Sequence, residues 1–140
     1  MLDYDQEIIT GLTSQLKGAF NLLEELSSKD LNALTTDPHL LSSAKYNFIV
    51  AIEAAIDICN HLISKNGYRV PEGYSDSFAI LAEQGILSDA LVEEKLVKMA
   101  RFRNRLVHQY WQINSEYLYE ILRTHLADFT SFLKEIGKSL

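Results

Sequence analysis

Apolar residues recur every third or fourth position through most of this chain, and that spacing constrains its fold more than any other feature. An α-helix turns once in about 3.6 residues, so the spacing gathers apolar side chains along one side of a helix. The apolar spacing runs through residues 4–26, 39–64, 90–108 and 115–133, and through a shorter stretch at 75–84. No stretch has the pattern of a convincing β-strand. The sequence therefore predicts an all-α antiparallel bundle of four main helices and a short fifth.

The breaks between these stretches carry the residues that end and begin helices. Asn66-Gly67 and Gly85 are suited to helix ends, and Ser88-Asp89 and Asn114-Ser115 to helix starts. Residues 31–34 suggest one further turn of helix. The six Gly and two Pro leave few other interruptions.

A chain of 140 residues is expected to fold as one domain, residues 1–140, burying about 68% of its unfolded surface. The single cysteine, Cys59, falls on an apolar helical stripe and is expected in the core. Charged and polar residues interrupt the most apolar stretch, 48–63, which predicts a core helix and not a membrane span. The start of the chain lacks the pattern of a signal peptide, so we expect a cytoplasmic location.

The charge is unevenly distributed. The formal net charge is −6, which argues against non-specific binding to nucleic acid, and no DNA partner is expected. Residues 95–108 nevertheless hold five Lys or Arg and no acid, whereas the rest of the chain holds 8 basic and 19 acidic side chains. A basic site on an acidic body suits a phosphate-bearing partner, and Arg101 and Arg105 are candidate phosphate contacts. On charge alone, a solvated basic helix face is the simpler interpretation.

Arg103 lies in the middle of an apolar helix stripe. A buried arginine needs a carboxylate, a phosphate or a wet cleft, and Asp57 is a reasonable carboxylate partner. His108 lies about 140° around the same ideal helix, so a straight helix would separate it from Arg103. Either the helix bends or ends between residues 106 and 111, or the two side chains meet across a dimer.

These residue types suit the cleavage of RNA without a metal or other cofactor. Histidine exchanges a proton near neutral pH and can activate a ribose 2′-OH or protonate a leaving 5′-oxygen. Arginine can stabilise the charge that develops on the phosphate, and Asn104 could orient either group. Taken alone, an arginine and a histidine five residues apart indicate little, and an interface pair is the simpler interpretation.

Other candidates are weaker. Glu53, Asp57 and His61 share a helix face and could bind a metal, although a solvated or salt-bridged face is far more common. Three aromatic residues could stack on bases, but are more simply explained by packing of the last helix: Trp111, Tyr117 and Tyr119. His39 and His125 have no constellation around them and are expected at the surface.

The segment Arg103-Asn104-x3-His108-x-Tyr110 resembles the R-x4-H-x-Y motif of the HepT family in the HEPN superfamily. The resemblance is close from about residue 48 to residue 111. It includes Ala51-Ile52-Glu53-Ala54-Ala55-Ile56-Asp57-Ile58 with His61, then Arg69-Val70-Pro71-Glu72, Phe78 with Leu81-Ala82, and Lys98-Met99-Ala100-Arg101-Phe102-Arg103-Asn104.

This resemblance implies a HEPN-like helical bundle that dimerises and cleaves RNA without a metal, as the toxin of a toxin–antitoxin pair. Arg103 and His108 carry over as the catalytic pair, with Asn104 assisting. It also implies an MntA-type minimal nucleotidyltransferase as antitoxin, which would transfer AMP from ATP to Tyr110. The added bulk and negative charge would keep RNA out of the cleft.

Two other functions stay open at this point. The chain could be a non-catalytic binding module that presents its cleft to a nucleotidyltransferase or a nucleotide, as the acidic net charge suggests. It could also be a plain helical dimerisation domain, in which Arg103 serves stability alone.

Overall fold

The computed structural model describes residues 2–140, and its regular structure is entirely helical. The helices are α1 (Gln6–Ser27), α2 (Leu31–Thr36), α3 (Pro38–Lys65), α4 (Tyr74–Glu83), α5 (Asp89–Leu91), α6 (Val97–His108), α7 (Ser115–Thr124) and α8 (Ala127–Ser139). A π-helical turn (Val92–Leu96) joins α5 to α6, and a 3₁₀ turn (Tyr110–Gln112) follows α6. The prediction of an all-α fold is confirmed.

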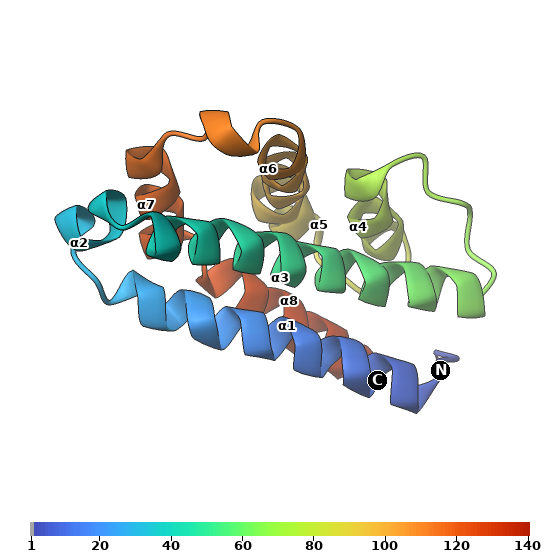
Figure 1. Ribbon diagram of the computed structural model, residues 1–140. Coiled ribbons are helices and arrows are strands. Elements are labelled where there is room, and N and C mark those ends of the chain that lie inside the picture. The colour runs from blue at the N-terminus through green and yellow to red at the C-terminus, as the bar shows by residue number, and fades with distance from the viewer. Residues whose placement is uncertain (1) are drawn as a thin grey trace.

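Helix α3 is the centre of the bundle. Its long antiparallel neighbour is α1, and α4, α6 and α7 lie along its other side (Figure 1). Helix α8 closes the bundle against α3 and α5. By length and composition α3 could also cross a membrane, but 61% of its most apolar stretch is buried in the fold. It is a core helix, as its sequence predicts, and Cys59 is fully buried in it.

The helix ends follow the sequence signals. Side-chain oxygens accept hydrogen bonds from the first free backbone N–H groups at Asp5, Asp30, Asp37, Ser88 and Asn114. Gly67 and Gly85 follow α3 and α4 with φ of 65° and 73°. Only glycine adopts this left-handed conformation without strain, so both helices end where predicted.

The prediction of a single helix over residues 115–133 is wrong in one respect. The chain forms two helices there, α7 and α8, with a break at His125 and Leu126. The periodicity continues through the break, so the apolar pattern could not reveal it. The break lets α8 turn toward the bundle, and the His125 ring lies 3.2 Å from a carboxylate oxygen of Asp128 across it. The His125 side chain is 42% exposed, so it lies at the surface as the sequence suggested, but in contact with Asp128.

The helix that carries the motif begins at α5 and is regular from Val97 to His108. Gln109 leaves the helical conformation, with φ −131° and ψ 37°. The helix therefore ends directly after His108 and does not bend between Arg103 and His108. Their separation around the helix axis stays at the expected value of about 140°.

Candidate active site

Arg103 lies where α3, α4 and α6 pack together, with its side chain 12% exposed. Its Nη2 and Nε donate to one carboxylate oxygen of Glu53, at 2.7 and 3.1 Å. Its Nη1 donates to Asn104 Oδ1 at 3.1 Å, and the ring of Tyr74 lies 4.3 Å from its Cζ. The expectation that Asp57 is the carboxylate partner of Arg103 is wrong. Asp57 lies one turn further along α3 and is exposed, and Glu53 pairs with Arg103 instead.

These contacts orient the guanidinium without using all of its donors. An arginine side chain has five N–H groups, and three are occupied by Glu53 and Asn104. One N–H on each Nη atom remains. A planar group held from two sides, with two donors to spare, is suited to binding a phosphate oxygen.

His108 occupies a different side of the helix. It is exposed at the last position of α6. Around the helix axis it points in nearly the same direction as Arg101 and Arg105, which are also exposed. Arg101 and Arg105 point roughly 160° away from Arg103, so they can assist His108 but not Arg103. Asn104 lies between Arg103 and His108 around the axis, one turn before His108. Within one protomer the structure therefore brings Arg103 and Asn104 together, but not Arg103 and His108.

Tyr110 is fixed just beyond the helix end by Lys45, a residue that was not among those predicted for the site. Lys45 of α3 donates from Nζ to the Tyr110 carbonyl oxygen at 2.9 Å, and its Nζ lies 4.7 Å from the centre of the Tyr110 ring. The Tyr110 hydroxyl donates a long hydrogen bond of 3.5 Å to the Ser42 carbonyl oxygen. Burial lowers the pKa of Lys45. Lys45 is the only Asp, Glu, Lys or Arg between residues 38 and 52. That isolation is the feature of the sequence that could have pointed to a specific role for Lys45.

The three residues considered as metal ligands do not form a site. Glu53 is engaged by Arg103, and His61 Nε2 accepts the backbone N–H of Asp5 at 2.9 Å. Partial loss of hydration on the packed helix, and then the nearby charge of Glu53, raise the pKa of the exposed Asp57 carboxyl. Among residues 2–140 no group of three His, Cys, Asp or Glu side chains is placed to hold a metal ion.

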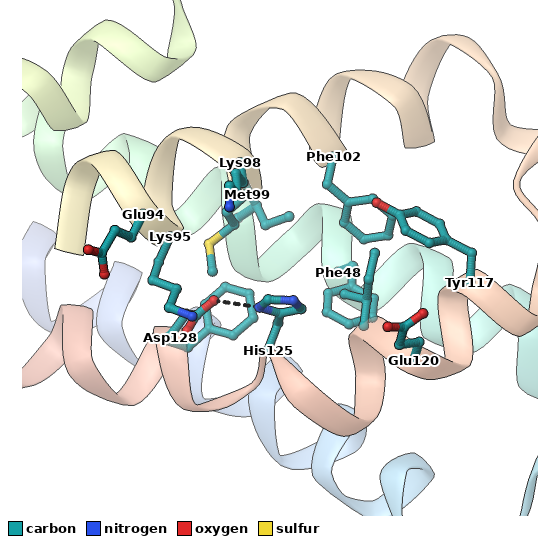
Figure 2. A pocket seen from close by; sticks show the side chains of 13 residues that line it. Phe48, Glu94, Lys95, Lys98, Met99, Phe102, Tyr117, Glu120, His125 and Asp128 are labelled. Atoms are coloured by element: carbon teal, nitrogen blue, oxygen red, sulfur yellow. Dashed lines mark hydrogen bonds and ion pairs between the residues drawn. The ribbon is translucent and has the colours of Figure 1, made fainter. Parts of the chain in front are cut away.

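A pocket of about 140 Å³ lies on another side of α6, away from the motif. Its apolar walls come from α3, α6, α7 and α8, and its rim carries Lys95, Lys98, Glu120 and the His125–Asp128 pair (Figure 2). None of Arg103, His108 or Tyr110 lines it. Its rim mixes cations and carboxylates, so its charge selects no particular ligand.

The helical bundle and the Arg103–His108–Tyr110 segment define the class of protein, an all-α HEPN domain. A family model described as Ribonuclease HepT-like matches residues 16–136. The chain belongs to this family of HepT-like ribonucleases, and its enzymatic class is that of an RNA nuclease.

Individual relatives agree with this assignment. The mRNA nuclease HepT of Shewanella oneidensis is 28% identical over 130 residues, which cover 93% of this chain and 96% of that protein. A putative RNase of Archaeoglobus fulgidus is 32% identical over 99 residues, covering 71% of this chain and 74% of that protein.

Two solved structures superpose closely. One is a tri-AMPylated Shewanella oneidensis HEPN toxin in complex with its MNT antitoxin, with a TM-score of 0.86, 28% identity, and coverage of 96% of this chain and 99% of that one. The other is a toxin–antitoxin complex with AMP-PNP, with a TM-score of 0.86, 27% identity, and coverage of 95% and 99%.

Proposed function

We propose that this protein is the endoribonuclease toxin of a toxin–antitoxin pair, with Arg103 and His108 as its catalytic residues and Asn104 assisting. The observation that carries the proposal is the orientation of the Arg103 guanidinium, which Glu53 and Asn104 hold while two of its N–H donors stay free. The nuclease and toxin names of the relatives support the same function. A cytoplasmic location is part of the proposal.

The chemistry follows from these two side chains. The ribose 2′-oxygen attacks the adjacent phosphorus, and the bond to the 5′-oxygen breaks, leaving a 2′,3′-cyclic phosphate and a 5′-hydroxyl. His108 takes the 2′-OH proton as a base or protonates the departing 5′-oxygen as an acid. Arg103 stabilises the extra negative charge on the phosphate, and Arg101 and Arg105 add positive potential beside His108. Because histidine and arginine supply both functions, the reaction requires no metal.

A homodimer completes the site in this proposal. Arg103 and His108 point about 140° apart on one regular helix, so one phosphate meets both most simply when they come from different protomers. The surface beside Arg103 favours such contact, because Tyr46, Tyr74 and Val107 are 64%, 44% and 42% exposed. Exposed apolar side chains on neighbouring helices are typical of a subunit interface.

Complementation between inactive variants tests the shared site. Arg103→Ala and His108→Ala protomers are each expected to be folded, dimeric and inactive on RNA. If the site is shared, co-refolded mixtures regain about a quarter of wild-type activity, because half of the dimers are mixed and each has one intact site. No recovery would place the complete site in one protomer. Equal cleavage by wild type and His108→Ala would rule out the catalytic role itself.

The proposed regulator is an MntA-like nucleotidyltransferase that transfers AMP to Tyr110. The Tyr110 hydroxyl is available for this, because its bond to the Ser42 carbonyl is long, at 3.5 Å. The intact mass after co-expression with the neighbouring nucleotidyltransferase gene should rise by whole AMP units, and Tyr110→Phe should abolish the increase at this position. Unmodified Tyr110 in an active antitoxin pair would contradict the proposal.

A non-catalytic binding module is the second candidate, and one observation favours it. His108 is exposed and belongs to a different side of α6 from Arg103. This candidate predicts tight association with the nucleotidyltransferase or with ATP, and no cyclic phosphate ends on any RNA. A plain dimerisation domain predicts instead that Arg103→Ala lowers stability or dimer affinity and changes nothing else.

A further inference from the structure

Trp111 is the most exposed aromatic side chain of the described chain, at 88%. The two other aromatics considered with it behave differently. Tyr117 packs edge-on against Phe102, and the Tyr119 hydroxyl donates to the Lys29 carbonyl oxygen. Packing of α7 therefore explains Tyr117 and Tyr119, but not Trp111. An indole left in water directly after the motif tyrosine requires another explanation.

The backbone that presents Trp111 is held in place. Gln112 N–H donates to the Gln109 carbonyl at 2.9 Å, and Lys45 Nζ donates to the Tyr110 carbonyl at 2.9 Å. The rings of Tyr110 and Trp111 meet nearly at right angles, with their centres 5.1 Å apart. The indole is therefore a fixed feature of the surface beside the motif.

The surroundings of the indole are polar and include one cation, Lys45, which is itself 9% exposed. Lys45 Nζ lies 6.0 Å from the centre of the Trp111 ring. The neighbouring Gln109, Gln112 and Asn114 are all exposed. A protein interface needs a broad apolar patch, whereas an exposed aromatic ring with an ammonium beside it matches the recognition of single-stranded nucleic acid.

We propose that Trp111 is a stacking platform for an unpaired nucleobase of the RNA substrate, with Lys45 supplying positive potential for the adjoining phosphate. The proposal rests on the RNase function proposed above. Trp111 is three residues after His108, so their Cα atoms lie within about 11 Å, and a base close to the cleaved bond can reach the indole. Bases in a duplex are already paired and stacked, so the platform selects single-stranded RNA.

The indole itself reports on the contact, because Trp111 is the only tryptophan in the chain. The full-length protein is titrated with a single-stranded 2′-O-methyl oligonucleotide, which lacks the nucleophilic hydroxyl and is not cleaved. The tryptophan fluorescence of the protein should be quenched saturably by this oligonucleotide. The duplex of the same oligonucleotide with its complement should quench the fluorescence far less. In cleavage assays on single-stranded RNA, Trp111→Ala should raise KM by roughly 5- to 150-fold, and Trp111→Tyr should restore most of the loss.

Val70→Ala is the matched control, because Val70 is 82% exposed and belongs to the loop before α4. It should leave KM unchanged. Fluorescence that stays constant while anisotropy shows the oligonucleotide bound would overturn the platform. So would an unchanged KM in Trp111→Ala with weakened dimerisation or antitoxin binding, which would make Trp111 a protein contact. If the wild type cleaves no RNA, the RNase function fails separately, and the quenching still decides whether Trp111 binds bases.

Discussion

One carboxylate oxygen of Glu53 accepts two hydrogen bonds from Arg103, from Nη2 at 2.7 Å and from Nε at 3.1 Å. The contact joins the middle of α3 to the motif helix α6. It neutralises a guanidinium that is largely withdrawn from water and fixes the direction of its plane. In the proposed mechanism Glu53 is thus a positioning residue, which acts on RNA through Arg103.

Glu53→Gln should lower RNA cleavage by about 10- to 100-fold, because a neutral amide orients the guanidinium less strongly than a carboxylate. The unfolding free energy should fall by about 1 kcal/mol only, since Glu53 is 41% exposed. Cleavage rates and urea denaturation measure the two effects. Asp57→Asn is the control one turn along α3, and its cleavage should stay within about twofold of wild type. Comparable losses in both variants would contradict the assignment of Glu53.

Arg103→Lys separates charge from geometry. Lysine keeps the positive charge beside Glu53 but lacks the planar set of donors that reaches Glu53, Asn104 and a phosphate together. Cleavage should fall by about 10²- to 10³-fold, as for the loss of a transition-state donor, while circular dichroism and the dimer mass stay as in wild type. A lysine variant with near-wild-type kcat would show that Arg103 contributes charge alone.

Much of this architecture was predictable from local sequence rules. The ends of a helix depend on residues that are close to them in the chain, so Ser88 and Asn114 indicated where helices begin and Gly67 where one ends. Arg103 was identifiable because it interrupts an apolar stripe. The break at His125 was not predictable, because the apolar periodicity runs through it while the backbone does not.

The partners within the site depend on tertiary register, which the sequence does not specify. Glu53 and Asp57 are both acids on adjacent turns of α3. Only the position of α6 along α3 decides that Glu53, and not Asp57, meets Arg103. Lys45 reaches Tyr110 across 65 positions of the chain. Spacing could show that Lys45 needs a partner, but not which one.

Lys45→Met should loosen the turn that carries Tyr110 and Trp111, because the bond from Nζ to the Tyr110 carbonyl is lost while the aliphatic stem is kept. Amide hydrogen exchange over residues 109–113 should accelerate, with the α1 and α3 amides unchanged. Lys65→Met is the control, since Lys65 is exposed at the end of α3. Unaltered exchange at 109–113 would mean that the turn is held without Lys45.

The last prediction concerns the ion cluster that anchors α4, the helix on which Tyr74 covers Arg103. Arg69 donates to Asp76 at 2.7 and 2.8 Å, and to Glu83 at 2.7 and 3.1 Å. Hydrogen bonds from Arg69 lower the pKa of Asp76 and of Glu83. Carboxyl groups with lowered folded-state pKa values stabilise the fold at neutral pH, and this contribution is lost as the pH falls through those values.

Arg69→Met should therefore shift the urea midpoint downward at pH 7. The difference from wild type should begin to shrink below about pH 4, where the two carboxyl groups protonate in the unfolded chain, and should disappear as the pH falls through their lowered folded-state pKa values. The shift should be small, because the cluster is solvent-exposed, and it should diminish in high salt. Arg123→Met is the matched control, since Arg123 donates to the Tyr119 hydroxyl and its shift should not follow the pH in this way. A difference between wild type and Arg69→Met that stays constant from pH 7 to pH 3 would show that Arg69 stabilises the loop by packing and not through the two carboxylates.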